Sequence, residues 1–172
     1  FWALWCYYMH TLKHLGAKQM ATRSTIALEY ADGTVGQVYC HWDGYLDNNG
    51  AILAQYYQDP FKVRALLDNG DLSSLGPNLG DQHEFDCPHK YGTPEYTAWS
   101  DAHREICTFY GRDRGETGTE SRNFATVAEW QEHYTHTGCE FFYLLQNKEW
   151  WYFDIYDVTE LTPVVFGLLA KD

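Results

Sequence analysis

Residues 24–42 read STIALEYADGTVGQVYCHW, and apolar residues alternate with polar ones on both sides of Asp32-Gly33. Alternation with a period of two places every second side chain on one face of a strand. The alternating residues are Ile26, Leu28, Tyr30, Val38, Cys40 and Trp42. Because an Asp-Gly pair between two such runs is a strong turn signal, the stretch predicts a β-hairpin.

A second hairpin is predicted near the C-terminal end. Residues 139–145 and 149–155 are both rich in aromatic residues, which favour strands. Gln146-Asn147-Lys148 separates the two runs and supplies the turn.

Signals for helices lie between the two hairpins. Asp59-Pro60 and Thr93-Pro94 each place a capping residue before a proline, and Thr126 is followed by Glu129 in a capping box. We therefore expect an α+β fold with an antiparallel sheet built from two β-hairpins and covered by three to four helices. Residues 71–92, rich in Gly, Pro, Asp and Asn, predict a long irregular connection, and loops of that length are often functional.

The composition is strongly acidic. The 172 residues include 24 Asp and Glu against 12 Lys and Arg, a formal net charge of −12. A surface this negative repels a nucleic-acid backbone and an anionic membrane, so neither is expected as a direct partner. Hydrophobic residues make up 45% of the chain, which is too many for a disordered protein. The five cysteines contain no CxxC pair, which is typical of reduced thiols in a cytoplasm.

The first nineteen residues differ from the rest. They do not begin with Met, and Met20-Ala21-Thr22-Arg23-Ser24 follows them as an ordinary bacterial start would. The order of apolar and basic residues is the reverse of that in a signal peptide. We expect residues 1–19 to be a leader or added extension and residues 20–172 to form a single α+β domain.

A thiol, an imidazole and a carboxylate follow one another at Cys40-His41-Trp42-Asp43. On a strand, Cys40 and His41 point to opposite faces, which argues against a nucleophilic cysteine paired with a histidine base. His41 and Asp43 share a face and, with Tyr45, form a candidate ligand-binding group, because a carboxylate can orient an imidazole. The alternative is a polar cluster that fixes the turn at Gly44.

Two arginines stand close together at Arg112 and Arg114, in an otherwise acidic chain. Guanidinium groups beside a glycine can hold a phosphate or a carboxylate through paired donors, so both residues are candidates for ligand binding. The alternative is a solvated turn with local ion pairs.

Two sets of His and Cys have spacings that suggest metal ligands. One is His83, Cys87 and His89, and the other is His133, His136 and Cys139. Neither has the paired short spacings of a structural zinc site, although the two sets could converge in space. We predict no metal and no cofactor.

Along the second predicted hairpin, strand alternation points some of the aromatic side chains away from the core. Trp150, Trp151 and Tyr152 are therefore candidates for an interface with a partner, while the alternative is that they fill the core. The sequence contains no GxSxG elbow, HExxH helix or phosphate-binding glycine loop, so no catalytic residue is assigned and an enzyme is not favoured.

The segments at residues 22–26, 39–45 and 70–76 resemble a group of small uncharacterised proteins from bacteriophages and prophages. The shared features are a Met-x-Thr-Arg-Ser start, Tyr-Cys-His-Trp-Asp-Gly-Tyr and Gly-Asp-Leu-Ser-Ser-Leu-Gly. This resemblance implies a phage setting and the cytoplasm of an infected bacterial host, and it carries no activity onto these residues.

Three functions are compatible with these sequence features. The first is a phage-encoded acidic protein that binds a host protein which handles nucleic acid or acts in defence, either as a counter-defence inhibitor or as a nucleic-acid mimic. The second is a protein that binds or processes a nucleotide-like small molecule, with His41, Asp43, Arg112 and Arg114 around one pocket. The third is a virion or assembly component. The oligomeric state is not predicted.

Overall fold

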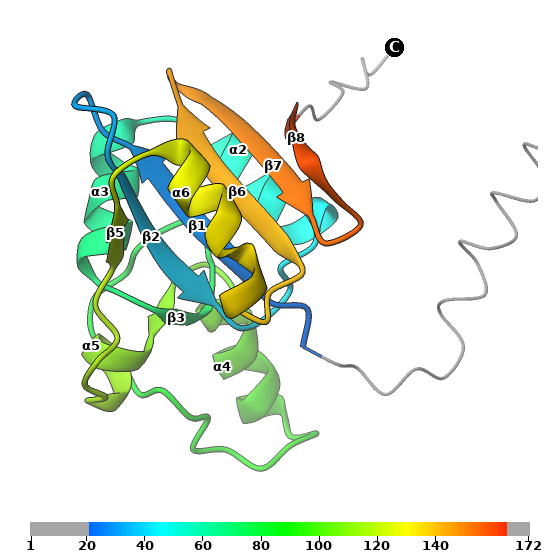
Figure 1. The fold of residues 1–172 in the computed structure, drawn as a ribbon. Helices are drawn as coiled ribbons and strands as arrows, with labels where there is room; N and C mark the ends of the chain where they lie inside the picture. Colours follow the sequence, from blue (N-terminus) through cyan, green and yellow to red (C-terminus); the bar gives the residue numbers. More distant parts are fainter. Residues whose placement is uncertain (1–20, 165–172) are drawn as a thin grey trace, which may run out of the picture.

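The computed structural model describes residues 21–164, so the predicted leader lies outside the described residues. A mixed eight-stranded sheet forms the centre, in the order β4-β3-β2-β1-β6-β7-β8, and β5 also pairs with β2 (Figure 1). The strands are β1 (Ser24–Glu29), β2 (Val35–Cys40), β3 (Leu72–Ser74), β4 (Thr108–Phe109), β5 (Arg122–Phe124), β6 (Phe141–Gln146), β7 (Glu149–Asp154) and β8 (Asp157–Pro163).

Five α-helices and two short helical turns complete the described part of the chain, so the fold is α+β as predicted, with more helices than expected. The helices are α2 (Ala51–Tyr56), α3 (Pro60–Asp68), α4 (Pro94–His103), α5 (Tyr110–Arg114) and α6 (Val127–Glu132), and the turns are η1 (Leu46–Gly50) and η2 (His133–His136).

Both predicted hairpins are confirmed. β1 and β2 pair antiparallel, and the turn between them has Gly33 at a φ of 84°, while the Asp32 carboxylate accepts from Thr34 N at 3.0 Å. β6 and β7 pair antiparallel around Asn147 and Lys148, which both have positive φ. Local turn chemistry therefore determines both elements.

The expectation of a purely antiparallel sheet was wrong. β1 pairs parallel with β6, which joins the two hairpins, and β2 pairs parallel with β3. β1 and β6 are buried on both faces, as central strands of a doubly covered sheet must be. The alternating residues of β1 and β2 predicted a sheet buried on one face, and the structure buries the other face of these strands as well.

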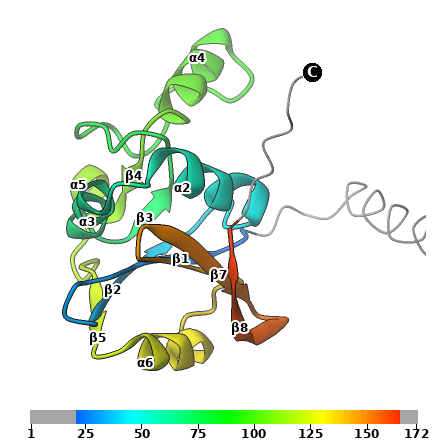
Figure 2. The same cartoon turned by 90° about the horizontal axis from the view of Figure 1, so that it is seen from above.

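Helices cover both faces of the sheet. Figure 2 shows α2 and α3 on one side and α6 on the other. Ile26, Leu28 and Tyr143 pack in the cluster on the α3 side, whereas Ala27 and Phe142 pack in the cluster with Trp130 of α6. Neighbouring residues of one strand thus serve two separate apolar cores.

The predicted caps are present. The Asp59 side chain accepts from Phe61 N at 2.9 Å at the start of α3, and Thr93 Oγ1 accepts from Tyr96 N at 3.2 Å at the start of α4. At α6, Thr126 Oγ1 accepts from Glu129 N at 3.2 Å. These side chains satisfy backbone donors that a helix start otherwise leaves unpaired.

Candidate functional site: an acidic arm

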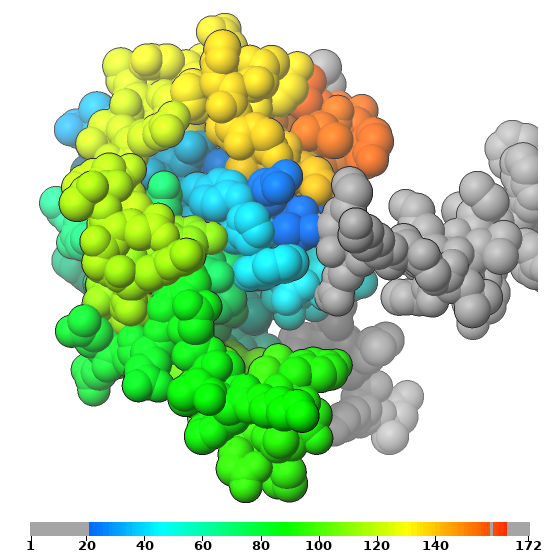
Figure 3. Space-filling model, turned by 90° about the horizontal axis from the view of Figure 1, so that it is seen from below, coloured from blue at the N-terminus to red at the C-terminus, as the bar shows by residue number. Residues whose placement is uncertain are grey.

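Residues 81–105 form a lobe that projects from the sheet, and we call it the acidic arm. It contains the long predicted connection and α4, and the figures show it standing away from the sheet and its covering helices (Figures 2 and 3). α4 has no buried residue, so this helix is not held by an apolar core. Its position must come from other contacts.

The surface of the arm combines carboxylates with aromatic rings. Lys90 and Arg104 are the only Lys and Arg residues of the segment, against six exposed carboxylate residues. Tyr91 is 82% exposed, and its ring meets that of Tyr96 edge-on at 5.1 Å. The carboxylate residues are Asp81, Glu84, Asp86, Glu95, Asp101 and Glu105.

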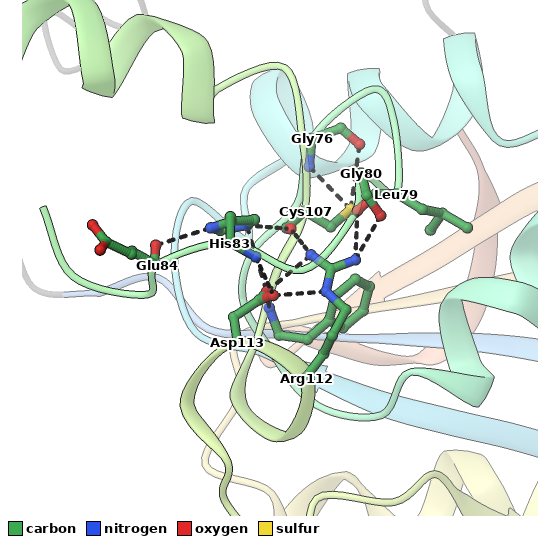
Figure 4. A network of polar contacts seen from close by, with 9 residues as sticks. Gly76, Leu79, Gly80, His83, Glu84, Cys107, Arg112 and Asp113 are labelled. Atoms are coloured by element: carbon green, nitrogen blue, oxygen red, sulfur yellow. Dashed lines mark hydrogen bonds and ion pairs between the residues drawn. The ribbon is translucent and has the colours of Figure 1, made fainter.

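A chain of rings connects α4 to the sheet side of the arm. The ring of Trp99 stacks on that of His103 with centroids 3.6 Å apart, and His103 meets His83 edge-on at 4.7 Å. The His83 ring then reaches Asp113 of α5, with Nε2 3.4 Å from Oδ2 (Figure 4). His83 Nδ1 also lies 2.9 Å from the carbonyl oxygen of Glu84.

Asp113 is the centre of the polar network that holds the arm. Its side chain is fully buried and accepts from Phe109 N at 2.7 Å and from His83 N at 3.2 Å, as well as from the Arg112 guanidinium (Figure 4). Burial raises the pKa of this carboxyl, but the hydrogen bonds from Arg112 and from the two backbone amides outweigh burial and hold the pKa below 3.8. Asp113 therefore stays ionised and keeps its donors at neutral pH.

Arg112 was a candidate for ligand binding, and the structure gives its guanidinium partners within the protein instead. Nε and Nη2 donate to Asp113 at 2.7 and 2.9 Å, while the remaining donors reach backbone carbonyls (Figure 4). These carbonyls belong to Leu79 (2.9 Å), Gly80 (2.8 Å) and Cys107 (2.8 Å). All five N–H groups of the guanidinium are thus used inside the protein, and none is left for an anion. Arg112 ties the start of the arm to β4 and α5.

Arg114 lies at the edge of the same region and is half-exposed. Its Nε is 3.3 Å from a Glu116 oxygen, and its guanidinium stacks over the ring of Phe85 at 4.8 Å. The contacts match the alternative of a local ion pair at a solvated turn, and they add one more contact between α5 and the arm.

His41 and Asp43 do not pair in the described part of the chain. His41 Nδ1 lies 2.7 Å from the Tyr39 hydroxyl, and burial followed by the nearby Arg23 charge lowers the pKa of the His41 imidazole. Asp43 has a φ of 55° and its carbonyl accepts from Asn49 N at 3.2 Å. These contacts support the alternative reading of a turn that is fixed by polar groups.

The turn also explains Gly44. A Cβ at this position would lie 2.8 Å from the backbone of Arg23 and from the side chain of Ser24, so only glycine fits between the segments. Tyr45 follows the turn and is exposed. Cys40, on the preceding strand, is buried with a pKa raised to about 12 by burial, which makes it an inert thiol.

The predicted interface on the second hairpin needs a correction. Trp150 is buried, and its Nε1 donates to Tyr57 O at 2.9 Å, so it belongs to the core. Trp151 and Tyr152 are half-buried. The large rings that are more than four-fifths exposed among the described residues lie elsewhere, at Phe61, Tyr91 and Tyr156.

The two His and Cys sets do not converge. Cys139 is buried, whereas His89 is exposed on the arm. Within residues 21–164, no three His, Cys, Asp or Glu side chains are grouped so that they can hold a metal ion. In the same part of the chain, every helix is too short or too polar to cross a membrane.

Sequence reasoning missed the arm as a surface. The length of the irregular connection indicated function, but the contacts that hold it come from residues 79–83 and 107–113, which are distant in the sequence. No family model, curated protein or solved structure matches the chain.

Proposed function

We propose that the protein is a non-enzymatic acidic binding protein that docks through its acidic arm on a positively charged surface of another protein. The observation that carries the proposal is Tyr91, 82% exposed on a projecting lobe among six exposed carboxylate residues. Exposed aromatic rings supply contact area at interfaces, and carboxylates steer a basic partner toward them.

The arm is suited to this role because it is held in place before a partner arrives. The Arg112–Asp113 network joins it to β4 and α5, because His83 N donates to Asp113 at 3.2 Å and Arg112 donates to the carbonyls of Leu79 and Gly80, just before the arm, at 2.9 and 2.8 Å. A surface that is already ordered loses less conformational entropy on binding than a mobile loop does. A fixed arm therefore gives a partner a defined arrangement of rings and charges.

The specific form of the proposal is that the partner is a host protein with a site for nucleic acid, met during phage infection. A site that receives phosphates is positively charged, so carboxylates on the arm can occupy it in place of the phosphates. The net charge of −12 adds long-range attraction to the same partner. The phage setting rests on the sequence resemblance alone.

The test is a capture experiment from a bacterial lysate at low and at high salt. The bait proteins are the wild-type chain, Tyr91→Ala and Tyr156→Ala, since Tyr156 is 88% exposed on the β7–β8 turn and so is a matched control. We expect a protein that is retained by wild type and by Tyr156→Ala, lost with Tyr91→Ala and released by salt. Excess duplex DNA should release it as well. Equal retention by wild type and Tyr91→Ala would contradict the arm as the binding surface. Retention that neither salt nor duplex DNA reduces would contradict nucleic-acid mimicry.

The small-molecule function remains a prediction, and one of its four residues is committed elsewhere. It needed His41, Asp43, Arg112 and Arg114 around one pocket, and the guanidinium of Arg112 is fully occupied by protein acceptors. The virion or assembly role remains a prediction, and its test is the oligomeric state of the purified chain in solution.

A further inference from the structure

A polar cavity of about 120 Å³ lies on the α6 face of the sheet, on residues different from those of the acidic arm. Pockets that enclose a whole small molecule usually start at ~300 Å³, so this cavity fits one group of a ligand. Its lining is polar and comes from five separate segments of the chain. The lining residues are Thr25, Gln37, Tyr39, Asp71, Arg122, His136 and Thr137.

The Thr25 hydroxyl is buried in the lining without a partner. Thr25 is 1% exposed, and its Oγ1 makes no hydrogen bond to any described residue. An unpaired buried hydroxyl is destabilising, and such groups in folded proteins are rare. A ligand oxygen in the cavity would pair it.

Gln37 adds a second donor to the floor of the cavity. Its Oε1 accepts from Trp130 Nε1 at 2.7 Å, which fixes the orientation of the side-chain amide. The amide nitrogen then points away from Trp130, and within residues 21–164 it has no hydrogen-bond acceptor. The lining therefore offers an amide donor in addition to the Thr25 hydroxyl.

The rim carries an exposed guanidinium without a direct ion pair to residues 21–164, although its charge acts at longer range on the Asp71 carboxyl. Among the described residues, no carboxylate oxygen lies within 4.0 Å of the Arg122 guanidinium, whose one polar contact is His133 Nε2 at 3.4 Å. Arg23 lies near the same group, because burial raises the pKa of the Tyr39 hydroxyl and the Arg23 charge acts against that rise. Arg112, by contrast, has every donor occupied. A guanidinium without a carboxylate in direct contact is unexpected in a chain this acidic, and its free donors suit an anion.

One carboxylate also lines the cavity. Asp71 Oδ1 accepts from Tyr39 N at 2.8 Å, and burial raises the pKa of the Asp71 carboxyl above its ordinary value. The raised pKa lowers the cost of protonating Asp71 when an anion enters. The protonated acid is then a further donor to that anion.

We propose that this cavity binds the phosphoryl group of a small phosphorylated ligand. Arg122 pairs with the phosphoryl oxygens from the rim with His136 beside it, and the Thr25 hydroxyl and the Gln37 amide donate from the floor. The rest of the ligand lies at the opening, since the volume fits no more than the phosphoryl group and its nearest atoms.

The test is calorimetric titration of the full chain with inorganic phosphate and, separately, with adenosine monophosphate, at constant ionic strength maintained with chloride. We expect both probes to bind. Tighter binding of the nucleotide would show that the opening also contacts the remainder of the ligand, and equal binding would show that the phosphoryl group alone is recognised. Failure of both probes to bind at millimolar concentration would overturn the proposal.

Three substitutions make the test specific to this cavity. Arg122→Gln should weaken binding at least tenfold, which is about 1.4 kcal/mol, and Thr25→Val should weaken it several-fold. Thr25→Val removes an unpaired hydroxyl and keeps the side-chain shape, so the melting temperature should hold or rise. Arg114→Gln is the matched control, because Arg114 is an exposed arginine outside the cavity, and it should leave binding unchanged. Equal affinity in all three variants would assign the binding to another place and overturn the proposal.

Discussion

The central sheet and the acidic arm are held by different interactions. β1 and β6 lie at the middle of the sheet with apolar side chains buried on both faces. The arm is held by a buried carboxylate and an arginine, and its helix α4 has no buried residue. Apolar burial stabilises the fold as a whole, whereas the polar network orients one surface.

This difference predicts that the arm and the sheet open with different free energies. Regions with few buried apolar contacts open at a lower free energy than the core does. The arm should therefore open before the sheet unfolds. Substitutions in the sheet should lower the stability of the whole chain, whereas substitutions in the network at Asp113 should affect mainly the arm.

The largest effect is expected from the sheet. Leu144 of β6 is completely buried, so Leu144→Ala should lower the free energy of global unfolding by about 2–5 kcal/mol. Urea unfolding followed by circular dichroism measures the change. Ile155→Ala is the control, because Ile155 is exposed and its loss should cost below ~0.5 kcal/mol. Equal losses in the two variants would contradict the assignment of the core.

A smaller and local effect is expected at Asp113. The isosteric Asp113→Asn places an amide N–H where Arg112 and Phe109 N require an acceptor, and it should weaken the anchoring of the arm by about 1–3 kcal/mol. Hydrogen exchange should accelerate at least tenfold in residues 81–105 and little in residues 141–154. Glu116→Gln, which alters an exposed ion pair with Arg114, serves as the control. Uniform acceleration over both segments would show that the arm and the sheet open together.

Acid should act on the arm in the same way. The pKa of Asp113 is lowered in the folded protein, so its contribution is complete above the ordinary value of 3.8 and is lost as the pH falls through the lower, folded-state value. Amide NMR signals of residues 81–105 should therefore broaden or shift as the pH falls below 3.8, before those of β1 and β6 change. Asp113→Asn should remove this step, and an unchanged acid transition in that variant would assign it to another group.

The smallest effect on stability is expected at Tyr91. The side chain is mostly in solvent, so Tyr91→Ala should change the unfolding free energy by less than ~0.5 kcal/mol. Thermal unfolding of the variant beside wild type is the measurement. A marked loss of stability would mean that Tyr91 supports the fold, and it would weaken the case for a binding surface.

The sequence was sufficient for the local elements. The hairpin at Asp32-Gly33 and the caps at Asp59 and Thr126 depend on neighbouring residues, so local patterns predicted them. The parallel pairing of β1 with β6 joins residues more than a hundred positions apart, and no turn signal specifies it.

The candidate sites were harder to predict for the same reason. Arg112 was a candidate for ligand binding because its acceptors at Leu79, Gly80 and Cys107 are remote in the sequence and gave no local signal. Conversely, Thr25 and Arg122 gave no signal, since only the fold brings them to one cavity. Whether an arginine can bind a ligand therefore depends on how many of its N–H donors already have acceptors in the folded chain.

The central claim is that the acidic arm is the binding surface, and the most direct test is a capture experiment on one fraction of proteins. Bacterial proteins retained on DNA–cellulose are offered to wild type, to Tyr91→Ala combined with Glu95→Gln, and to Tyr156→Ala combined with Glu160→Gln. The account predicts a protein held by wild type and by the β7–β8 variant but lost by the arm variant. The same proteins on all three baits, or none on wild type, would contradict it.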